Sequence, residues 1–163
     1  MTNILIPTDF SPASLHLAEQ AILALEGSRL NIVLFHAFEL PDSAFDLVGP
    51  SRKKPYYDLL TDAFRQSCKQ LKEQHTRTVQ KIGFKCMEGN SASLFRNFVD
   101  ANDIDIIICP VYYEFVPVHK QSIDPRPFFK KSGVRILSDL NPRRKEIIVR
   151  STKTAEEKLV ASN

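Results

Sequence analysis

The sequence predicts a three-layer α/β domain around a doubly wound, mainly parallel sheet of five strands. Five short runs, four apolar and one alternating, are typical of strands, and continuous apolar runs are typical of parallel strands covered on both faces. Four segments with apolar residues at helical spacing lie between them, and strands that alternate with helices favour this architecture. The length of 163 residues, with 43% hydrophobic and 25% charged residues, suits one globular domain.

A strand, a helix and a second strand are predicted at the start of the chain. The run 3–8 is apolar at its centre, and Ser11 followed by Pro12 supplies an N-cap and a proline at the first helical position. Helical spacing continues to Gly27, which can close the helix. The apolar run 30–36 completes a unit of the size of a right-handed βαβ crossover.

The middle of the chain adds a long helix, an edge strand and a short helix. After a loop over residues 40–55, the segment 57–79 carries the apolar stripe of a long helix. The run 81–86 alternates, and its two lysines fall on one face, which is a common protection of an edge strand. Ser91 is expected to cap the helix that follows, whose apolar residues extend to Val99.

An interior strand, a short helix and a final strand complete the predicted domain. The run 103–109 is the clearest interior strand, residues 122–131 can form a short helix that starts near Asp124, and 134–137 is the last strand. In doubly wound sheets ligands bind beyond the carboxyl ends of the strands, where the strand order reverses. The segments that we expect there are 8–11, 37–40, 87–91 and 110–115.

Charge and cysteine content exclude several functional classes. The net charge is +3, and residues 141–163 hold six basic and three acidic groups, so that residues 1–140 carry 16 of each. A neutral body gives no electrostatic reason to bind nucleic acid. No apolar run approaches the roughly 20 residues of a membrane span, and the N-terminus is unlike a secretion signal. Three cysteines without a CxxC pair indicate neither a disulfide framework nor a zinc site, which favours the reducing cytoplasm.

The residues at the predicted strand ends resemble the universal stress protein family. The opening ILIPTDFS, residues 4–11, is similar to the family's first strand and turn almost residue for residue. The end of the second strand, to Glu39, and the stretch 88–109 are similar to further parts of the family pattern. The resemblance covers residues 3 to about 138 and implies an adenine nucleotide alpha-hydrolase-like fold with strand order 3-2-1-4-5. It also implies a homodimer and a cytoplasmic role in stress response.

One branch of that family binds ATP, and the resemblance extends only to its adenine positions. There an Asp after the first strand and the end of the second strand hold adenine, and Asp9 and Ala37 match them. A loop of the form GxxGx9G(S/T) after the fourth strand holds the phosphates, but residues 109–122 of this chain contain no glycine. Glycines let bare N–H groups approach phosphate oxygens, whereas Pro110 and Pro117 have no N–H. The chain therefore resembles a member without the phosphate loop.

Several side chains at this edge of the sheet are candidate ligand contacts. Asp9 either contacts a ligand or bonds nearby N–H groups at the start of the first helix. Tyr112 and Tyr113 form either a platform for a small ligand or a loop closed over its own core. His36 ends a buried strand and is expected to be a satisfied core histidine. The candidate ligand-binding residues are Thr8, Asp9, Ala37, Tyr112, Tyr113 and Ser122.

The leading hypothesis is a non-catalytic binding or regulatory protein of the universal stress type, without a cofactor or a metal. It acts as a homodimer in the cytoplasm, with an unknown protein as a possible further partner and with no membrane or nucleic-acid contact. The expected interface is the final strand, an apolar edge with one charge. The residues of this interface are Val134, Ile136 and Leu137.

Two alternatives remain open. The first is a protein that binds ATP or AMP in an altered pose at Asp9 and the end of the second strand, with weak hydrolysis at most. The second is an interaction module whose basic tail, residues 141–163, contacts an acidic protein or nucleic acid. We expect this tail to be a partly ordered addition to a domain formed by residues 1–140, with the apolar run 147–149 packed on the body or on a second subunit.

Overall fold

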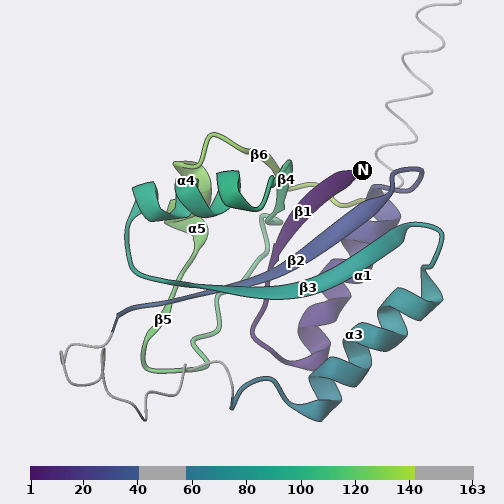
Figure 1. Ribbon diagram of the computed structural model, residues 1–163, viewed down its shortest axis with the longest axis horizontal. Helices are drawn as coiled ribbons and strands as arrows, with labels where there is room; N and C mark the ends of the chain where they lie inside the picture. The colour runs from purple at the N-terminus through teal and green to yellow at the C-terminus, as the bar shows by residue number, and fades with distance from the viewer. Residues whose placement is uncertain (41–57, 142–163) are drawn as a thin grey trace, which may run out of the picture.

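The computed structural model describes residues 1–40 and 58–141. Figure 1 shows helices on both faces of a sheet, which gives the three layers predicted from the sequence. In this part of the chain five parallel strands lie in the order β3-β2-β1-β4-β6. Their bounds are Thr2–Pro7 (β1), Leu30–Phe38 (β2), Val79–Glu88 (β3), Ile106–Ile108 (β4) and Arg135–Leu137 (β6). They are the five predicted strands, so the predicted order 3-2-1-4-5 is confirmed.

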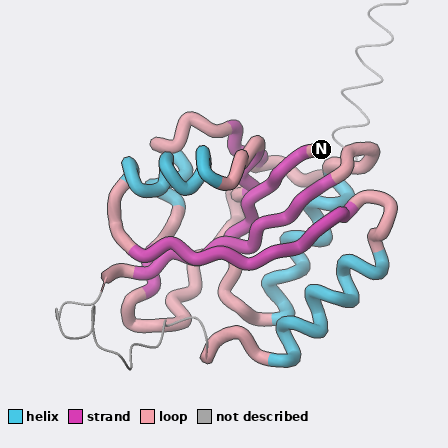
Figure 2. The backbone as a smooth tube through the Cα atoms, in the orientation of Figure 1, coloured by secondary structure: helices cyan, strands magenta, loops and turns pink. Residues whose placement is uncertain are grey.

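Two hydrophobic cores lie on the two faces of the sheet, because successive strand residues point to opposite sides. Ile4 and Ile6 of β1 join the core that contains side chains of α1 and α3, whereas Leu5 joins the core of α4 and α5. The helices are Leu15–Ala24 (α1), Asp62–Gln74 (α3), Ala92–Ala101 (α4) and Arg126–Lys130 (α5). Figure 2 shows the sheet between these two helical layers. Burial on both faces explains the continuous apolar runs at the centres of β1, β2 and β4.

The turn from the first strand into the first helix forms as predicted. Ser11 is the N-cap of a 3-10 turn, η1 (Pro12–Ser14), and its Oγ accepts a hydrogen bond from Ser14 N at 3.1 Å. The helix α1 follows directly. Gly27 then leaves the helix with a φ of 95°, a conformation that favours glycine.

The long helix predicted over residues 57–79 is shorter than expected. Thr61 is its N-cap, and the Oγ1 atom accepts a hydrogen bond from Phe64 N at 3.1 Å, so that α3 begins at Asp62. Val79, which continued the apolar stripe in the sequence, already belongs to β3 and is buried there. The apolar residues keep their helical spacing beyond the end of α3, so the spacing alone did not show where the helix ends.

The interior strand predicted over 103–109 contains only three strand residues, those of β4. Asp103 adopts a φ of 50°, so the chain is still turning where the strand was expected to start. The apolar character of the run comes from burial, since Ile104 is only 6% exposed although it precedes the strand.

A short antiparallel strand, β5 (Ser122–Ile123), was not predicted. It pairs with the end of β2, where Ala37 lies opposite Ile123 and Phe38 lies opposite Ser122. The short helix predicted within 122–131, with its start near Asp124, begins at Arg126. Two residues are too few for strand periodicity to be recognised in a sequence.

The outer strands of the parallel sheet are β3 and β6. At one edge, the Lys85 side chain of β3 donates a hydrogen bond to the Asn102 side chain at the end of α4. At the other edge, the side chains expected to form a dimer interface are half-buried and already contact the two cores: Val134 and Ile136 contact one core and Leu137 the other. The predictions for 41–57 and for the tail from residue 142, including 147–149, lie outside the described residues.

Candidate functional site

A cavity of about 230 Å³ lies where the connections from β1 and β4 diverge at the carboxyl edge of the sheet. The strand β1 leads to α1 on one face, and β4 leads toward α5 on the other, so this is the point at which the strand order reverses. Open α/β sheets bind their ligands at such a point. The residues that line the cavity include Asp9, Leu17, Gln20, Tyr112, Tyr113 and Glu114.

Asp9 closes the turn after β1 and also lines the cavity. Its Oδ1 accepts hydrogen bonds from Ser11 N at 3.0 Å and from Ser11 Oγ at 2.5 Å. Because Ser11 is the cap of η1, Asp9 holds the first helical turn in place. The turn role and the ligand role that the sequence left open for Asp9 are therefore compatible.

Thr8 supports the same turn and is not among the residues that line the cavity. Phe10 has a φ of 64°, which is uncommon for a residue other than glycine, and its N–H donates to Thr8 Oγ1 at 3.1 Å. The Ser14 hydroxyl donates to the Ser11 carbonyl at 2.7 Å, so its only hydrogen is used. Thr8 Oγ1 must then be the donor to Ser14 Oγ at 2.9 Å. This series of bonds holds the unusual turn.

His36, at the end of β2, is 4% exposed and has both ring nitrogens bonded. Its Nδ1 lies 2.7 Å from the Thr8 carbonyl oxygen, which can only accept, so Nδ1 carries a proton. Burial lowers the pKa of His36 from the usual 6.5, against the opposing effect of the Thr8 bond. The neutral ring therefore accepts a hydrogen bond at Nε2 from Ser122 Oγ at 2.9 Å. His36 is the satisfied core histidine that was predicted.

Ser122 and Ala37 lie beside His36, and the cavity lining does not include them. Ser122 Oγ accepts a hydrogen bond from His119 N at 3.1 Å, in addition to its bond with His36. Ala37 is 1% exposed and pairs with Ile123 of β5. The end of β2 is thus covered by the chain itself.

Two tyrosines of the loop after β4 are held by different contacts. Tyr112 is 64% exposed, and its hydroxyl donates to Gln20 Oε1 of α1 at 2.8 Å. Tyr113 is half-buried, and its N–H donates to the Pro110 carbonyl at 3.0 Å. Burial raises the pKa of the Tyr113 phenol, which stays protonated. The loop is therefore attached to α1 through Tyr112 and is held in a turn of its own at Tyr113.

Arg126 of α5 lies against Tyr113. Its Cζ is 5.9 Å from the centroid of the Tyr113 ring, within the range of a cation–π contact. The guanidinium also forms a salt bridge with Asp124, where Nη2 and Oδ2 are 2.6 Å apart. Hydrogen bonding from Arg126 holds the pKa of Asp124 below its usual value. Sequence reasoning missed this pair, because its partners are two residues apart on either side of Pro125 and match no helical or strand period.

The structure brings three of the six candidate residues to the cavity and leaves three outside it. The cavity is lined by Asp9, Tyr112 and Tyr113. Outside its lining are Thr8, Ala37 and Ser122. Gln20 was missed, although its position was available from helical spacing, since Leu17 and Gln20 are three residues apart on one face of a helix. Glu114 is also absent from the candidate residues, because a single acidic side chain in a loop follows no period that would mark it.

The described parts of the chain, residues 1–40 and 58–141, also bear on metal binding and on membrane insertion. In these parts no group of three His, Cys, Asp or Glu side chains is arranged to hold a metal ion. Burial raises the pKa of the thiols of Cys68 and Cys109, so both stay protonated. None of the helices within residues 1–40 and 58–141 combines the length and the hydrophobicity that crossing a membrane requires.

Comparison with known proteins identifies the family. No curated protein gives a significant match to the sequence. Among solved structures, the hypothetical protein MJ0577 has a TM-score of 0.52 at 16% identity, over 84% of this chain and 94% of its own. A universal stress protein in complex with cAMP has a TM-score of 0.46 at 16% identity, over 85% and 96% of the two chains. A universal stress protein family member from Burkholderia pseudomallei has a TM-score of 0.44 at 17% identity, over 86% and 96%.

The likeness to MJ0577 shows a shared fold. The sequence comparison goes further, because the model of the universal stress protein family matches residues 1–111, which is more than half of the chain. This match contains β1, the turn at Asp9, β2 and β4. The chain therefore belongs to the universal stress protein family.

Proposed function

We propose that this chain is a non-catalytic binding or regulatory protein of the stress response, which acts as a homodimer in the cytoplasm. The observation that carries the proposal is the loop after β4, which stands where the ATP-binding branch of the family has its phosphate loop. The segment 109–122 contains no glycine, and Tyr112 ties this loop to α1. A site closed in this way favours a ligand other than ATP.

The loop offers few donors to a triphosphate. Loops that bind phosphate do so with several backbone N–H groups turned toward one point. Here Pro110 and Pro117 have no N–H, and the N–H of Tyr113 is already bonded within the loop. Asp9 and Glu114 add two carboxylates to the lining of the cavity, and both repel phosphate oxygens. These features support the absence of ATP binding in the usual pose of the family.

The strand β5 supports the same conclusion at the adenine position. Ala37, which matches that position, is paired with Ile123. Glu39 N, two residues further along the chain, bonds the Gln121 carbonyl at 2.7 Å. Main-chain groups that pair two strands are not available to recognise a purine.

Ser122 and His36 are hydrogen-bonded to each other, as a catalytic nucleophile and its general base are, but the surroundings of the pair favour a structural role. His36 is 4% exposed, and the Ser122 hydroxyl also accepts a hydrogen bond from the backbone of His119. Neither side chain lines the cavity. The pair attaches β5 to β2, and we propose no reaction there.

Thermal unfolding in the presence of millimolar Mg-ATP tests the proposal. A ligand at about 100 times its dissociation constant stabilises a protein by about 2.7 kcal/mol. That free energy raises the melting temperature of a domain of this size by several degrees. We expect no shift relative to magnesium chloride alone and no phosphate release above the buffer rate. A clear upward shift in the wild type, absent in Asp9→Ala relative to its own baseline, contradicts the proposal.

A second candidate is nucleotide binding in an altered pose. It is favoured by the position of Asp9, whose carboxylate lines a cavity that also has tyrosine side chains in its walls. Binding of AMP distinguishes this candidate from the first, because AMP lacks the β- and γ-phosphates, for which the loop provides no set of backbone N–H donors. A shift with AMP that is lost in both Asp9→Ala and Tyr113→Leu supports the second candidate, and no shift leaves the first.

A further inference from the structure

We propose that the cavity beside Asp9 binds a small organic cation of the quaternary ammonium type, held by the carboxylates of Asp9 and Glu114 and by the tyrosine rings of the loop after β4. The inference rests on the proposed function, because it assigns a ligand class to the site that we propose does not hold ATP. It is carried by the charge, the aromatic walls and the size of the cavity.

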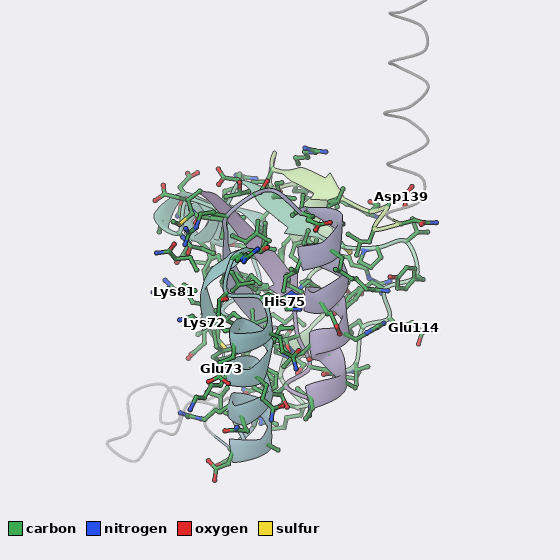
Figure 3. The ribbon with its side chains drawn as sticks, turned by 90° about the vertical axis from the view of Figure 1, so that its right-hand side faces the viewer. Lys72, Glu73, His75, Lys81, Glu114 and Asp139 are labelled. Carbon is green, nitrogen blue, oxygen red and sulfur yellow. The ribbon has the colours of Figure 1, made fainter. Side chains whose placement is uncertain are left out.

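The charges around the cavity favour a cation. Asp9 and Glu114 are the acidic residues of its lining, and no lysine or arginine of the described residues is part of that lining. Glu114 lies on the side of α1 that faces away from α3, as Figure 3 shows. His16 also belongs to the lining, but its ring is directed to solvent, with 72% of the side chain exposed and Nδ1 lying 3.9 Å from Glu19 Oε2. A cation therefore meets two opposite charges there, and an anion meets two like charges.

The basic side chain that contacts a tyrosine of the cavity is already paired with a carboxylate. Arg126 touches Tyr113, but it forms a salt bridge with Asp124 and does not line the cavity. It also shows that the Tyr113 ring accepts a cation on its π face, since Cζ lies 5.9 Å from the ring centroid. The Tyr112 ring is oriented in advance by the 2.8 Å bond from its hydroxyl to Gln20. A ring fixed before binding loses little rotamer freedom when a ligand arrives.

The size of the cavity restricts the ligand further. Drug-sized ligands occupy pockets of about 300–1,000 Å³, and the present volume of about 230 Å³ lies below that range. Pro110 and Leu17 add apolar surface, which suits methyl groups rather than a strongly hydrated ammonium. A methylated ammonium combines small size, positive charge and an apolar surface, and aromatic side chains recognise this class by cation–π contact.

Calorimetric titration of the full-length protein with choline is the test, with 3,3-dimethylbutan-1-ol as its uncharged isostere. The titrations are run at about pH 8, where imidazole groups of ordinary pKa are uncharged. We expect one site for choline and binding of the isostere that is weaker by about tenfold, as a partly desolvated cation–π contact implies. Equal binding of the two compounds overturns the inference. No binding of choline up to about 10 mM, which corresponds to a binding free energy weaker than about 3 kcal/mol, overturns it as well.

Substitutions locate the site. We expect Glu114→Gln and Tyr112→Leu each to weaken choline binding several-fold, whereas Tyr112→Phe keeps the ring and most of the affinity. Glu26→Gln removes an exposed carboxylate outside the lining and serves as the matched control. Tyr112 and Glu114 are exposed, so these variants keep the fold. Choline binding that none of the site variants changes places the ligand elsewhere and overturns the inference.

Parallel titration with Mg-ATP separates the two proposals. If neither choline nor Mg-ATP binds, the cation inference fails and the proposed function stands. If Mg-ATP binds and choline does not, both fail. Choline binding without Mg-ATP binding is the expected result.

Discussion

Phe10 adopts a backbone conformation that side chains other than glycine rarely take, and the residues around it explain why the chain tolerates it. Its φ is 64°, and its ring is buried among aromatic neighbours, with the centroids of His36 and Phe84 at 5.1 Å and 4.9 Å. Within the described residues every buried side-chain nitrogen or oxygen has a hydrogen-bond partner. The strained turn is thus fixed by ring packing and by the hydroxyl of Thr8, and it presents Asp9 to the cavity.

The buried imidazole of His36 makes stability depend on pH. Burial lowers the pKa of this group in the folded chain below the value of 6.5 that it has when unfolded. As the pH falls below about 6.5 the unfolded chain takes up a proton that the folded chain resists, so the stabilising contribution is complete above that pH and is lost below it. We expect the free energy of unfolding to fall between about pH 7 and pH 5 by up to about 1.4 kcal/mol per pH unit from this group.

Chemical denaturation of His36→Gln over the same pH range checks this expectation. The variant removes the titrating group but keeps an amide that can donate and accept, so its stability should change less steeply with pH than that of the wild type. His16→Gln, at a side chain that is 72% exposed, is the control and should follow the wild type. If His36→Gln and the wild type show the same slope, His36 is not the titrating group.

Predictions for single residues were confirmed where the residue type forms a characteristic hydrogen bond with its neighbours in sequence. Ser11 and Ser91 were recognised as helix caps because a serine before an apolar helical pattern bonds the first free N–H groups. The role of Ser122 was not recognised, because its hydroxyl bonds His36, and these two residues become neighbours only when β5 pairs with β2. The role of Thr8 was not recognised either, because its hydroxyl bonds Ser14, six residues further along the chain, through an unusual turn that the residue types do not specify.

At the scale of elements, the connection from β3 to α4 depends on one glycine. Gly89 has a φ of 135°, and a Cβ atom there would lie 2.5 Å from Leu94 Cδ2. We expect Gly89→Ala to lower the free energy of unfolding by about 1–3 kcal/mol, because the conformation is strained for any side chain and Leu94 must move.

Gly83→Ala is the matched control for that measurement. Gly83 lies within β3 at an ordinary φ, and the nearest atom to an added Cβ is 4.0 Å away. Alanine in a strand interior loses less backbone entropy than glycine, so this variant should be neutral or slightly more stable. Denaturant melts that show equal losses for the two variants would mean that the backbone of Gly89 is not strained.

The presence of the helices and strands and their succession along the chain could be predicted better than the residues at which they begin and end. The apolar runs of β1 and β2 and the cap of α1 identified those elements, because burial on both faces leaves a pattern in the sequence itself. The end of α3 and the short strand β5 could not be placed. The helix end falls within a continuous apolar stripe, and β5 owes its structure to pairing with β2 rather than to its own two residues.

At the scale of the whole molecule, β6 is the edge at which we expect two copies to meet. It has three residues, and among the described strands it pairs with β4. The opposite edge, β3, carries Lys81 and Lys85, which discourage pairing between sheets. We expect Ile136→Lys to convert a dimer into a monomer, because charge at a self-complementary interface is repeated on both subunits.

Light scattering at micromolar concentration measures the mass, and circular dichroism confirms that the variant is folded. Ile82→Lys places the same change at a half-buried position of β3, the other edge, and should remain dimeric. Arg135→Glu tests the same edge through an exposed side chain, in case Ile136→Lys does not fold. Folded variants of β6 that keep the mass of a dimer would show that the subunits meet elsewhere.

The strand order and the family were predicted from the resemblance, since residue patterns alone do not specify which strands are neighbours. The location of the cavity followed from the topology, because the carboxyl ends of β1 and β4 meet where the order reverses. The covering of Ala37 by β5 could not be foreseen, because it joins segments that are 86 residues apart.

The central claim is that the loop after β4 has replaced a phosphate site with a site that does not hold ATP. Calorimetric titration of the full-length protein with Mg-ATP tests it most directly, since it reads binding without relying on stability. We predict no saturable heat up to about 1 mM ligand, which corresponds to binding weaker than about 4 kcal/mol. A single site with a dissociation constant of about 10 μM or lower, lost in Asp9→Ala, would contradict the account.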